Sequence, residues 1–238
     1  IVGAYYNDGG GNAAGEAYVY HGSASGLSST PDWSDQGEAE DDYFGYRVAS
    51  AGDVNGDGYA DVIVGAHGNN GAVGEVYLYH GSSSGLSATP DWSDQGEASG
   101  DYFSYNVASA GDVNGDGYVD VIVSADSNDD AGNSAGEVYV YSFGVSAALA
   151  AWEDWSDQGE TADDQFGRSV ASAGDVNGYG YADVIVGANE NDDGGNNAGE
   201  AYVYHGSSSG LSATPDWSDQ GEAGDDNFGR SVASAGDV

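Results

Sequence analysis

The chain has 238 residues, enough for one large domain or two small ones, and 41 acidic residues against 3 basic ones give it a formal net charge of -38. A chain this acidic repels nucleic acids and anionic lipid surfaces, so a nucleic-acid-binding role is excluded. The absence of cysteine excludes disulfides, thiolate catalysis and zinc–cysteine sites, and no apolar run approaches the length of a membrane span, so we expect no direct membrane insertion. The sequence opens at Ile1 with neither Met nor a signal peptide, as expected of a mature product or an excerpt.

Short apolar strings separated by Gly, Asn, Asp and Ser predict strands along the whole chain. In residues 44–102 they predict strands at 47–51, 61–66 and 74–80, and a weaker strand at 91–93. Val, Ile and Tyr dominate these strings, and no segment shows the 3.6-residue period of a helix. The pattern therefore predicts an all-β chain.

The same order of elements recurs four times. AGDVNGDGYADVIVGA at 51–66 returns with small changes at 110–125 and 173–188, and DWSDQGE occurs four times. Both patterns repeat every 60 residues or so, roughly the size of a four-stranded propeller blade. We therefore predict a single β-propeller domain of four-stranded antiparallel blades, with units at 44–102, 103–165, 166–227, and 228–238 combined with 1–43.

The two ends of the sequence match the two halves of one unit. SAGDV at 234–238 and IVGA at 1–4 are joined elsewhere by eight residues, NGDGYADV at 55–62. One interpretation is a ring closed by pairing of the N- and C-terminal strands in a shared blade, which would remove exposed sheet edges. The other is a longer parent chain with more blades, of which this sequence is an excerpt.

A loop after the first strand of each unit carries metal-ligand chemistry. In the first copy, side-chain oxygens stand at loop positions 1, 3, 5 and 9, and position 7 offers a carbonyl oxygen: Asp53, Asn55, Asp57, Asp61 and Tyr59. Calcium takes six to eight hard oxygen ligands, and glycine at positions 4 and 6 permits the curled backbone that such a loop needs. Three carboxylates packed this closely without a cation would repel one another, so we expect calcium here.

The other copies of this loop differ in their ligand count. The second copy is intact: Asp112, Asn114, Asp116, Tyr118 and Asp120. The third has Tyr179 at position 5 and keeps Asp175, Asn177, Tyr181 and Asp183. The fourth survives only as Asp237. The third loop should bind calcium more weakly or not at all, because it offers two carboxylates in place of three.

The stretches FGYRVASAGDVNGDGYADVIVGA (44–66) and FGRSVASAGDVNGYGYADVIVGA (166–188) resemble FG-GAP repeats, the blade units of the integrin α-subunit β-propeller. The resemblance covers essentially the whole chain in four copies. It implies a calcium-binding propeller of an extracellular or cell-surface protein, with the loop residues named above as ligands. The chain departs from the family at the proline of "GAP", which is absent, and at Phe103, which Ser104 follows in place of glycine. It also contains four units where the integrin-type propeller has seven.

The other recurring residues are assigned to packing or turns. The DWSDQGE tryptophans and the paired tyrosines of the third strand fit interblade packing better than sugar stacking. Each of the three arginines follows an FG or equivalent pair and should form ion pairs, and the histidines of the YHGS segments should lie at strand ends.

We expect a non-catalytic adhesion or protein-interaction module, because the sequence contains no recognisable catalytic set. Its binding surface should be the loops that precede the GE strands, which crowd one face and are rich in Asp, Asn and Gly. A protein or a glycan would bind there. The alternatives are a glycan-binding propeller, a self-assembling unit of a surface layer or filament, and a non-catalytic module of a larger hydrolase or lyase.

Overall fold

The computed structural model describes residues 1–144 and 152–236, which form four antiparallel sheets that we call blades 1 to 4 in chain order. Blade 1 contains β1 (Val2–Ala4), β2 (Glu16–Val19) and β5 (Trp33–Gln36). Blade 2 contains β6 (Arg47–Gly52), β7 (Asp61–Ala66), β8 (Glu75–Tyr79) and β9 (Trp92–Gln95). Blade 3 contains β10 (Asn106–Gly111), β11 (Asp120–Ala125), β12 (Glu137–Ser142) and β13 (Trp152–Gln158). Blade 4 contains β14 (Phe166–Gly174), β15 (Asp183–Ala188), β16 (Glu200–Tyr204) and β17 (Trp217–Gln220).

Two small elements lie outside these sheets. The hairpin β3 (Gly22–Ser23) and β4 (Gly26–Leu27) follows β2, and the single helical turn α1 (Asn69–Ala72) lies in the loop between β7 and β8. The predicted all-β fold and its four-stranded antiparallel sheets are confirmed. In blade 2 the predicted strands agree with β6 to β9 to within a few residues, including the outer strand.

Within each four-stranded blade the strands lie in sequence order, and each strand pairs antiparallel with the next one along the chain. The first hairpin has a register shift just before the predicted calcium loop, between Ser50 and Gly52 in blade 2, with matching shifts in blades 3 and 4. β7 and β11 are buried along their whole length, because each lies inside its own blade and between two neighbouring blades. This explains their continuous Val and Ile content.

The hydrophobic core lies between blades. Three buried clusters fill the spaces between blades 1 and 2, blades 2 and 3, and blades 3 and 4. In the middle one, Phe103 from the start of blade 3 packs against Tyr139, and Trp92 packs against Tyr141, with ring centroids 5.4 and 5.0 Å apart. The same pairs recur at the other two interfaces. The predicted interblade packing of tryptophan and tyrosine is therefore confirmed.

Glycine before each GE strand lets blades approach closely. Gly74 has a φ of +86°, and a Cβ there would collide with the backbone oxygen of Phe103. Any larger residue would therefore force apart the segment that carries the core phenylalanine.

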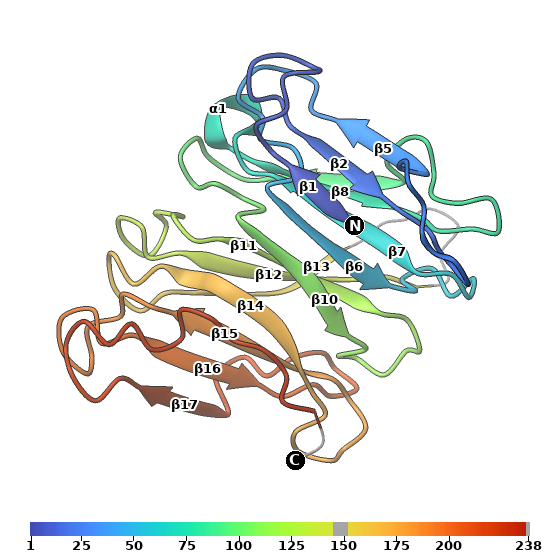
Figure 1. Cartoon of the computed structure of the whole chain (residues 1–238). Helices are drawn as coiled ribbons and strands as arrows, with labels where there is room; N and C mark the ends of the chain where they lie inside the picture. Colours follow the sequence, from blue (N-terminus) through green and yellow to red (C-terminus); the bar gives the residue numbers. More distant parts are fainter. Residues whose placement is uncertain (145–151, 237–238) are drawn as a thin grey trace.

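The predicted closing pair of strands does not form within the described residues. β1 pairs with β2 alone, and residues 231–236 form no strand. Instead, the C-terminal segment lies beside β14, where the Ser234 hydroxyl donates to the Ala173 carbonyl oxygen at 3.1 Å. Figure 1 shows the blades in a curved row, with blade 1 at the top and blade 4 at the bottom. Because blades 1 and 4 stand at opposite ends of this row, the N- and C-terminal strands are not neighbours.

Candidate functional site

The three predicted calcium loops join the first and second strands of blades 2, 3 and 4. They lie at the right-hand ends of the sheets in Figure 1, and the loops that precede the GE strands lie at the opposite ends, near α1. The predicted grouping of the variable loops on one face thus agrees with the topology, and the candidate metal loops occupy the other face.

In the first loop, side chains at positions 1, 3 and 5 turn back onto the loop's own backbone. The Asp53 carboxylate accepts the N–H groups of Asp57 and Gly58 at 3.0 and 2.9 Å. Asn55 Oδ1 accepts the Asp57 N–H at 2.9 Å, and Asp57 Oδ1 accepts the Tyr59 N–H at 2.9 Å. These bonds hold the oxygens around a turn whose glycines have φ values of +73° and +90°. Each carboxylate oxygen keeps a further lone pair for a cation.

The aspartate at position 9 is fully buried. Asp61 accepts the N–H groups of Val54 and Gly81, both at 2.8 Å. In the second loop Asp120 Oδ2 accepts the Val113 N–H at 2.9 Å, but Asp120 Oδ1 is buried without a hydrogen-bond partner. Burial raises the pKa of Asp120 to about 7. The corresponding oxygen of Asp61 accepts the Gly81 N–H, so the position 9 aspartate links its loop to the end of the third strand.

The third loop keeps this backbone arrangement with one carboxylate fewer. Asp175 accepts the N–H groups of Tyr179 and Gly180 at 3.0 and 2.8 Å, as Asp53 does with its own loop. The Tyr179 ring is 80% exposed and supplies no oxygen to the loop. Asp237, the predicted remnant of a fourth loop, lies outside the described residues.

The described residues do not bring the three carboxylates of one loop to within 4.8 Å of one another. The one acidic group that meets this spacing in the described parts of the chain is Glu97, Asp130 and Glu137, between blades 2 and 3. Glu137 is buried and accepts the Tyr139 hydroxyl at 3.0 Å. We assign this group no function.

Burial, followed by the charge of Asp130, raises the pKa of Glu97 above its ordinary value of 4.5. The contribution of the Glu97 carboxyl to folding stability is therefore fully present below pH 4.5 and is lost as the pH rises through the raised pKa. We predict that Glu97→Gln raises the melting temperature of the calcium-free chain by about 1 °C at neutral pH. Calorimetry in chelator tests this, with Glu222→Gln at the same repeat position as the control. A lower melting temperature for Glu97→Gln would contradict the prediction.

Adjacent loops contact each other directly. The Tyr118 ring of the second loop covers Gly56 of the first, and a Cβ on Gly56 would lie 2.6 Å from that ring. Tyr181 covers Gly115 in the same way, and the Ala182 N–H donates to the Asp112 carbonyl oxygen at 2.9 Å. Position 7 of one loop is thus packed on position 4 of the preceding loop.

The opposite face carries an aromatic cluster that the sequence analysis missed. The His67 ring lies 4.1 Å from Tyr46 and 5.3 Å from Tyr43, between blades 1 and 2, and Tyr46 lies 5.4 Å from Tyr105 of blade 3. Burial and the charge of Arg47 lower the pKa of His67 to about 4, so this histidine is neutral at physiological pH. The recurrence of Tyr two residues after the FG phenylalanine, in FGY and FSY, was the available signal.

Two of the three arginines lie at this cluster. Arg168 pairs with buried Asp126 at 2.8 Å and lies 4.7 Å above the Tyr105 ring, which confirms the predicted ion pair for this residue. Arg47 instead lies 5.3 Å from the Tyr46 ring centroid. The histidines of the YHGS segments lie at strand ends as predicted, each within 4 Å of an aspartate.

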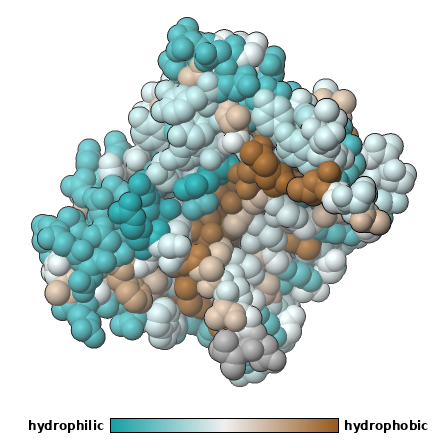
Figure 2. Space-filling view, in the orientation of Figure 1, coloured by the Kyte–Doolittle hydropathy of each residue, from teal (hydrophilic) through white to brown (hydrophobic). Residues whose placement is uncertain are grey.

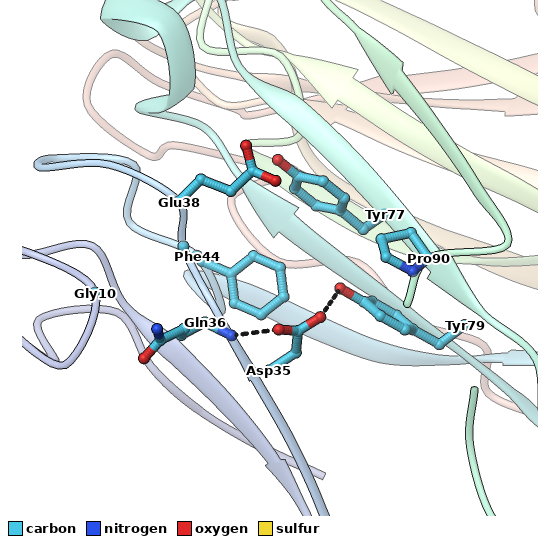
Figure 3. Close-up of a pocket in the computed structure, with 9 residues that line it drawn as sticks. Gly10, Asp35, Gln36, Glu38, Phe44, Tyr77, Tyr79 and Pro90 are labelled. Atoms are coloured by element: carbon cyan, nitrogen blue, oxygen red, sulfur yellow. Dashed lines mark hydrogen bonds between the residues drawn. The ribbon is translucent and has the colours of Figure 1, made fainter. Parts of the chain in front are cut away.

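A pocket of about 270 Å³ lies between blades 1 and 2 (Figure 3). The Tyr79 hydroxyl enters it and donates to Asp35 Oδ2 at 2.9 Å, and the Phe44 ring lies close by. Tyr204 and Asp157 repeat this bond at 2.8 Å between blades 3 and 4. The aspartate of the DWSDQGE segment thus joins blade 1 to a tyrosine of blade 2, and blade 3 to a tyrosine of blade 4.

No helix in the described part of the chain is long and apolar enough to cross a membrane.

The sheets and their loops define a class of repeat protein built from propeller-type blades. The model of the FG-GAP-like repeat matches residues 53–123, and that of the FG-GAP repeat matches residues 156–204. The chain belongs to the FG-GAP repeat family.

Several integrin α chains are similar to this one. Integrin alpha-PS2 of Drosophila melanogaster is 31% identical over 182 residues, which are 74% of this chain and 12% of the relative. Integrin alpha pat-2 of Caenorhabditis briggsae is 31% identical over 197 residues, 75% of this chain and 15% of the relative. Integrin alpha-6 of Gallus gallus is 36% identical over 143 residues, 58% of this chain and 12% of the relative. The chain therefore spans only a small part of each.

Proposed function

We propose that the chain is a calcium-stabilised, non-catalytic adhesion or protein-interaction module of an extracellular or cell-surface protein. The observation that carries the calcium proposal is the pair of intact loops, in which carboxylate and amide oxygens at positions 1, 3 and 5 face a tight glycine turn. The ligands would be the residues at positions 1, 3, 5 and 9, with the carbonyl oxygen of position 7.

Calcium would act here by neutralising charge. When bound, it would supply positive charge to a loop whose aspartates otherwise repel one another, and it would fix the turn between the first two strands of a blade. Since both strands line the interblade core, an ordered turn stabilises the blade that carries the binding loops on the other face.

A protein partner at the variable-loop face fits the aromatic cluster and the charge. Tyr6 and Tyr102 are exposed there, and tyrosine is enriched at protein interfaces. The net charge of -38 favours a basic partner, whose association should slow as salt is added. Binding assays against basic protein ligands at low and high salt, alongside a glycan array, test this proposal. Binding to glycans alone would favour the lectin alternative.

The glycan alternative loses one supporting feature. Three of the four DWSDQGE tryptophans, Trp33, Trp92 and Trp155, pack against tyrosines of the following blade. These three rings are therefore not free to stack on sugars.

The sites should differ in calcium affinity. The two intact loops offer three carboxylates each and the third offers two, and affinity in such loops follows ligand charge and number. We predict that the native chain binds two calcium ions and that Tyr179→Asp adds a third binding event in a calorimetric titration. Tyr179→Ser, which removes the same ring without adding charge, is the control. Native binding of three ions with equal affinity would show that backbone carbonyls outweigh the carboxylate count.

A further inference from the structure

Neighbouring calcium loops are joined through the peptide unit that follows position 7. In the second loop its carbonyl oxygen belongs to Tyr118 and is one of the proposed calcium ligands. Its N–H group belongs to Val119 and donates to the Asp53 carbonyl oxygen of the first loop at 3.4 Å. One rigid, planar group thus carries a ligand of one site and a hydrogen bond to the residue that opens the preceding site.

The second and third loops are joined by the same link. The Ala182 N–H donates to the Asp112 carbonyl oxygen at 2.9 Å, and the carbonyl of this peptide unit belongs to Tyr181. Asp53 and Asp112 stand at position 1 of their loops, so their carboxylates are themselves proposed ligands. Each link therefore connects two residues that would bind calcium in adjacent sites.

Side-chain packing holds the link between the first two loops in place. The half-buried Tyr118 ring lies on Gly56, where a Cβ would come within 2.6 Å of it. Val119 lies on Gly52, just before the first loop, where a Cβ would come within 2.8 Å of its side chain. The two glycines have φ values of +73° and +82°, so an L residue at either position would also be strained. The second loop is therefore fitted closely to the backbone of the first.

The first loop is also anchored between blades 2 and 3. Val54, at position 2, is fully buried in the cluster between these blades. Its N–H donates at 2.8 Å to Asp61, the buried aspartate at position 9. A change at the contact with the second loop would therefore be felt by ligands at both ends of the first.

The loops themselves lie in a polar part of the surface. In Figure 2 hydrophobic surface gathers in the middle of the face, within a largely hydrophilic surround, and the calcium loops project from the right-hand ends of the sheets. Asp57 and Asp116 are exposed on these loops. The first two loops are thus held together by the hydrogen bond and the ring contact more than by a shared apolar surface.

We propose that the two intact loops bind calcium with positive cooperativity, transmitted by the peptide unit between Tyr118 and Val119. A cation on the Tyr118 carbonyl oxygen would polarise this unit and make the Val119 N–H a stronger donor. The hydrogen bond to Asp53, at 3.4 Å, is longer than the usual value of about 2.9–3.0 Å and has room to shorten. A firmer bond would fix Asp53, so less ordering would remain when the first loop binds its own cation. This inference rests on the proposed calcium function.

Repulsion between the two cations acts in the opposite direction. Salt screens this repulsion, because the Debye length is about 8 Å at 0.15 M ionic strength and about 3 Å at 1 M. The link between the loops is a direct contact, which salt affects much less. We therefore expect net positive coupling at roughly 0.15 M salt, and stronger coupling as salt is added.

Calorimetric titration of the 238-residue chain measures the coupling. Asp57→Asn leaves the second loop as the intact site, and Asp116→Asn leaves the first, so the two variants give the affinity of each loop alone. The product of the two stepwise binding constants of the native chain should exceed the product of these single-loop constants about fivefold. Tyr118→Ala keeps the carbonyl ligand but removes the ring, and in this background the excess should fall below about twofold.

Tyr59→Ala is the matched control. Tyr59 stands at position 7 of the first loop and keeps its carbonyl oxygen when its side chain is shortened. Its ring is 44% exposed and, within the described residues, covers no glycine of another calcium loop. The fivefold excess should therefore persist in this variant.

Hydrogen exchange at the linking amides tests the mechanism separately. In the Asp57→Asn chain, calcium should slow exchange of the Val119 N–H about fivefold or more, because only the second loop is then intact. In Tyr179→Asp, which completes the third loop, calcium should slow exchange of the Ala182 N–H beyond its rate in Tyr179→Ser.

The possible outcomes separate this inference from the function on which it rests. Binding at both intact loops with no excess over the single-loop product overturns the inference and leaves the calcium function standing. The same holds if Tyr118→Ala retains the full excess, or if calcium leaves Val119 exchange unchanged. A chain that binds no calcium overturns both proposals.

Discussion

Removal of calcium is expected to lower the melting temperature by about 10 °C. A ligand that binds only the folded state stabilises it in proportion to the logarithm of its concentration over the dissociation constant. With extracellular-type affinities of about 10⁻⁴–10⁻³ M, roughly 10 mM calcium contributes about 1.4–2.7 kcal/mol per loop. Two loops together account for the shift in a chain of this size. Calorimetry with calcium and with chelator measures it.

The second and third loops of the predicted set provide a matched pair of variants. Asp112→Asn and Asp175→Asn remove the carboxylate at position 1, which accepts backbone N–H groups in both loops. The loss of these bonds should cost the same in chelator. Only Asp112→Asn should reduce the calcium-dependent part of the melting temperature, by about half. An equal calcium-dependent loss in both variants, or no response of the native chain to chelator, would contradict the assignment of the two intact loops.

Truncation of a core phenylalanine between blades is expected to destabilise the chain about as much as the removal of calcium. Phe103 is 1% exposed and packs on Tyr139, so Phe103→Ala should lower the free energy of unfolding by about 3–5 kcal/mol. Phe228 stands at the same repeat position but is 39% exposed, and Phe228→Ala should cost about 1 kcal/mol in dilute solution. Urea unfolding measures both values. Similar losses for the two variants would mean that Phe228 is covered in solution.

The sequence was sufficient to predict the elements that depend on a local pattern of residues. Alternating Tyr residues in EVYLY place both rings on one side of β8, and the rings pack on Trp33 and Phe44 as such a pattern requires. The DVIVGA strand of blade 2 is apolar after its first residue because neighbouring blades cover both of its faces. These features recur from unit to unit, so the interpretation of the residue pattern in one unit could be applied to the others.

Features that depend on the angle between units could not be predicted in this way. Whether 231–236 reaches β1 depends on how far each blade rotates from the last, which no local pattern encodes. The aromatic cluster joins His67 to tyrosines from neighbouring units, and its members are scattered over more than sixty positions of the sequence. The hydrogen bonds that buried Asp61 accepts from the Val54 and Gly81 N–H groups could not be predicted either, because they depend on the three-dimensional path of the loop.

The contact of Tyr118 with Gly56 means that a repeat is not an independent module. The boundary of the sequence repeat falls between these two residues, but the packed ring spans it. Exchange of one unit for another would therefore preserve the fold only where the incoming tyrosine meets a glycine in the preceding loop. Substitutions at these two positions are then linked across units, and selection on one loop constrains the sequence of its neighbour.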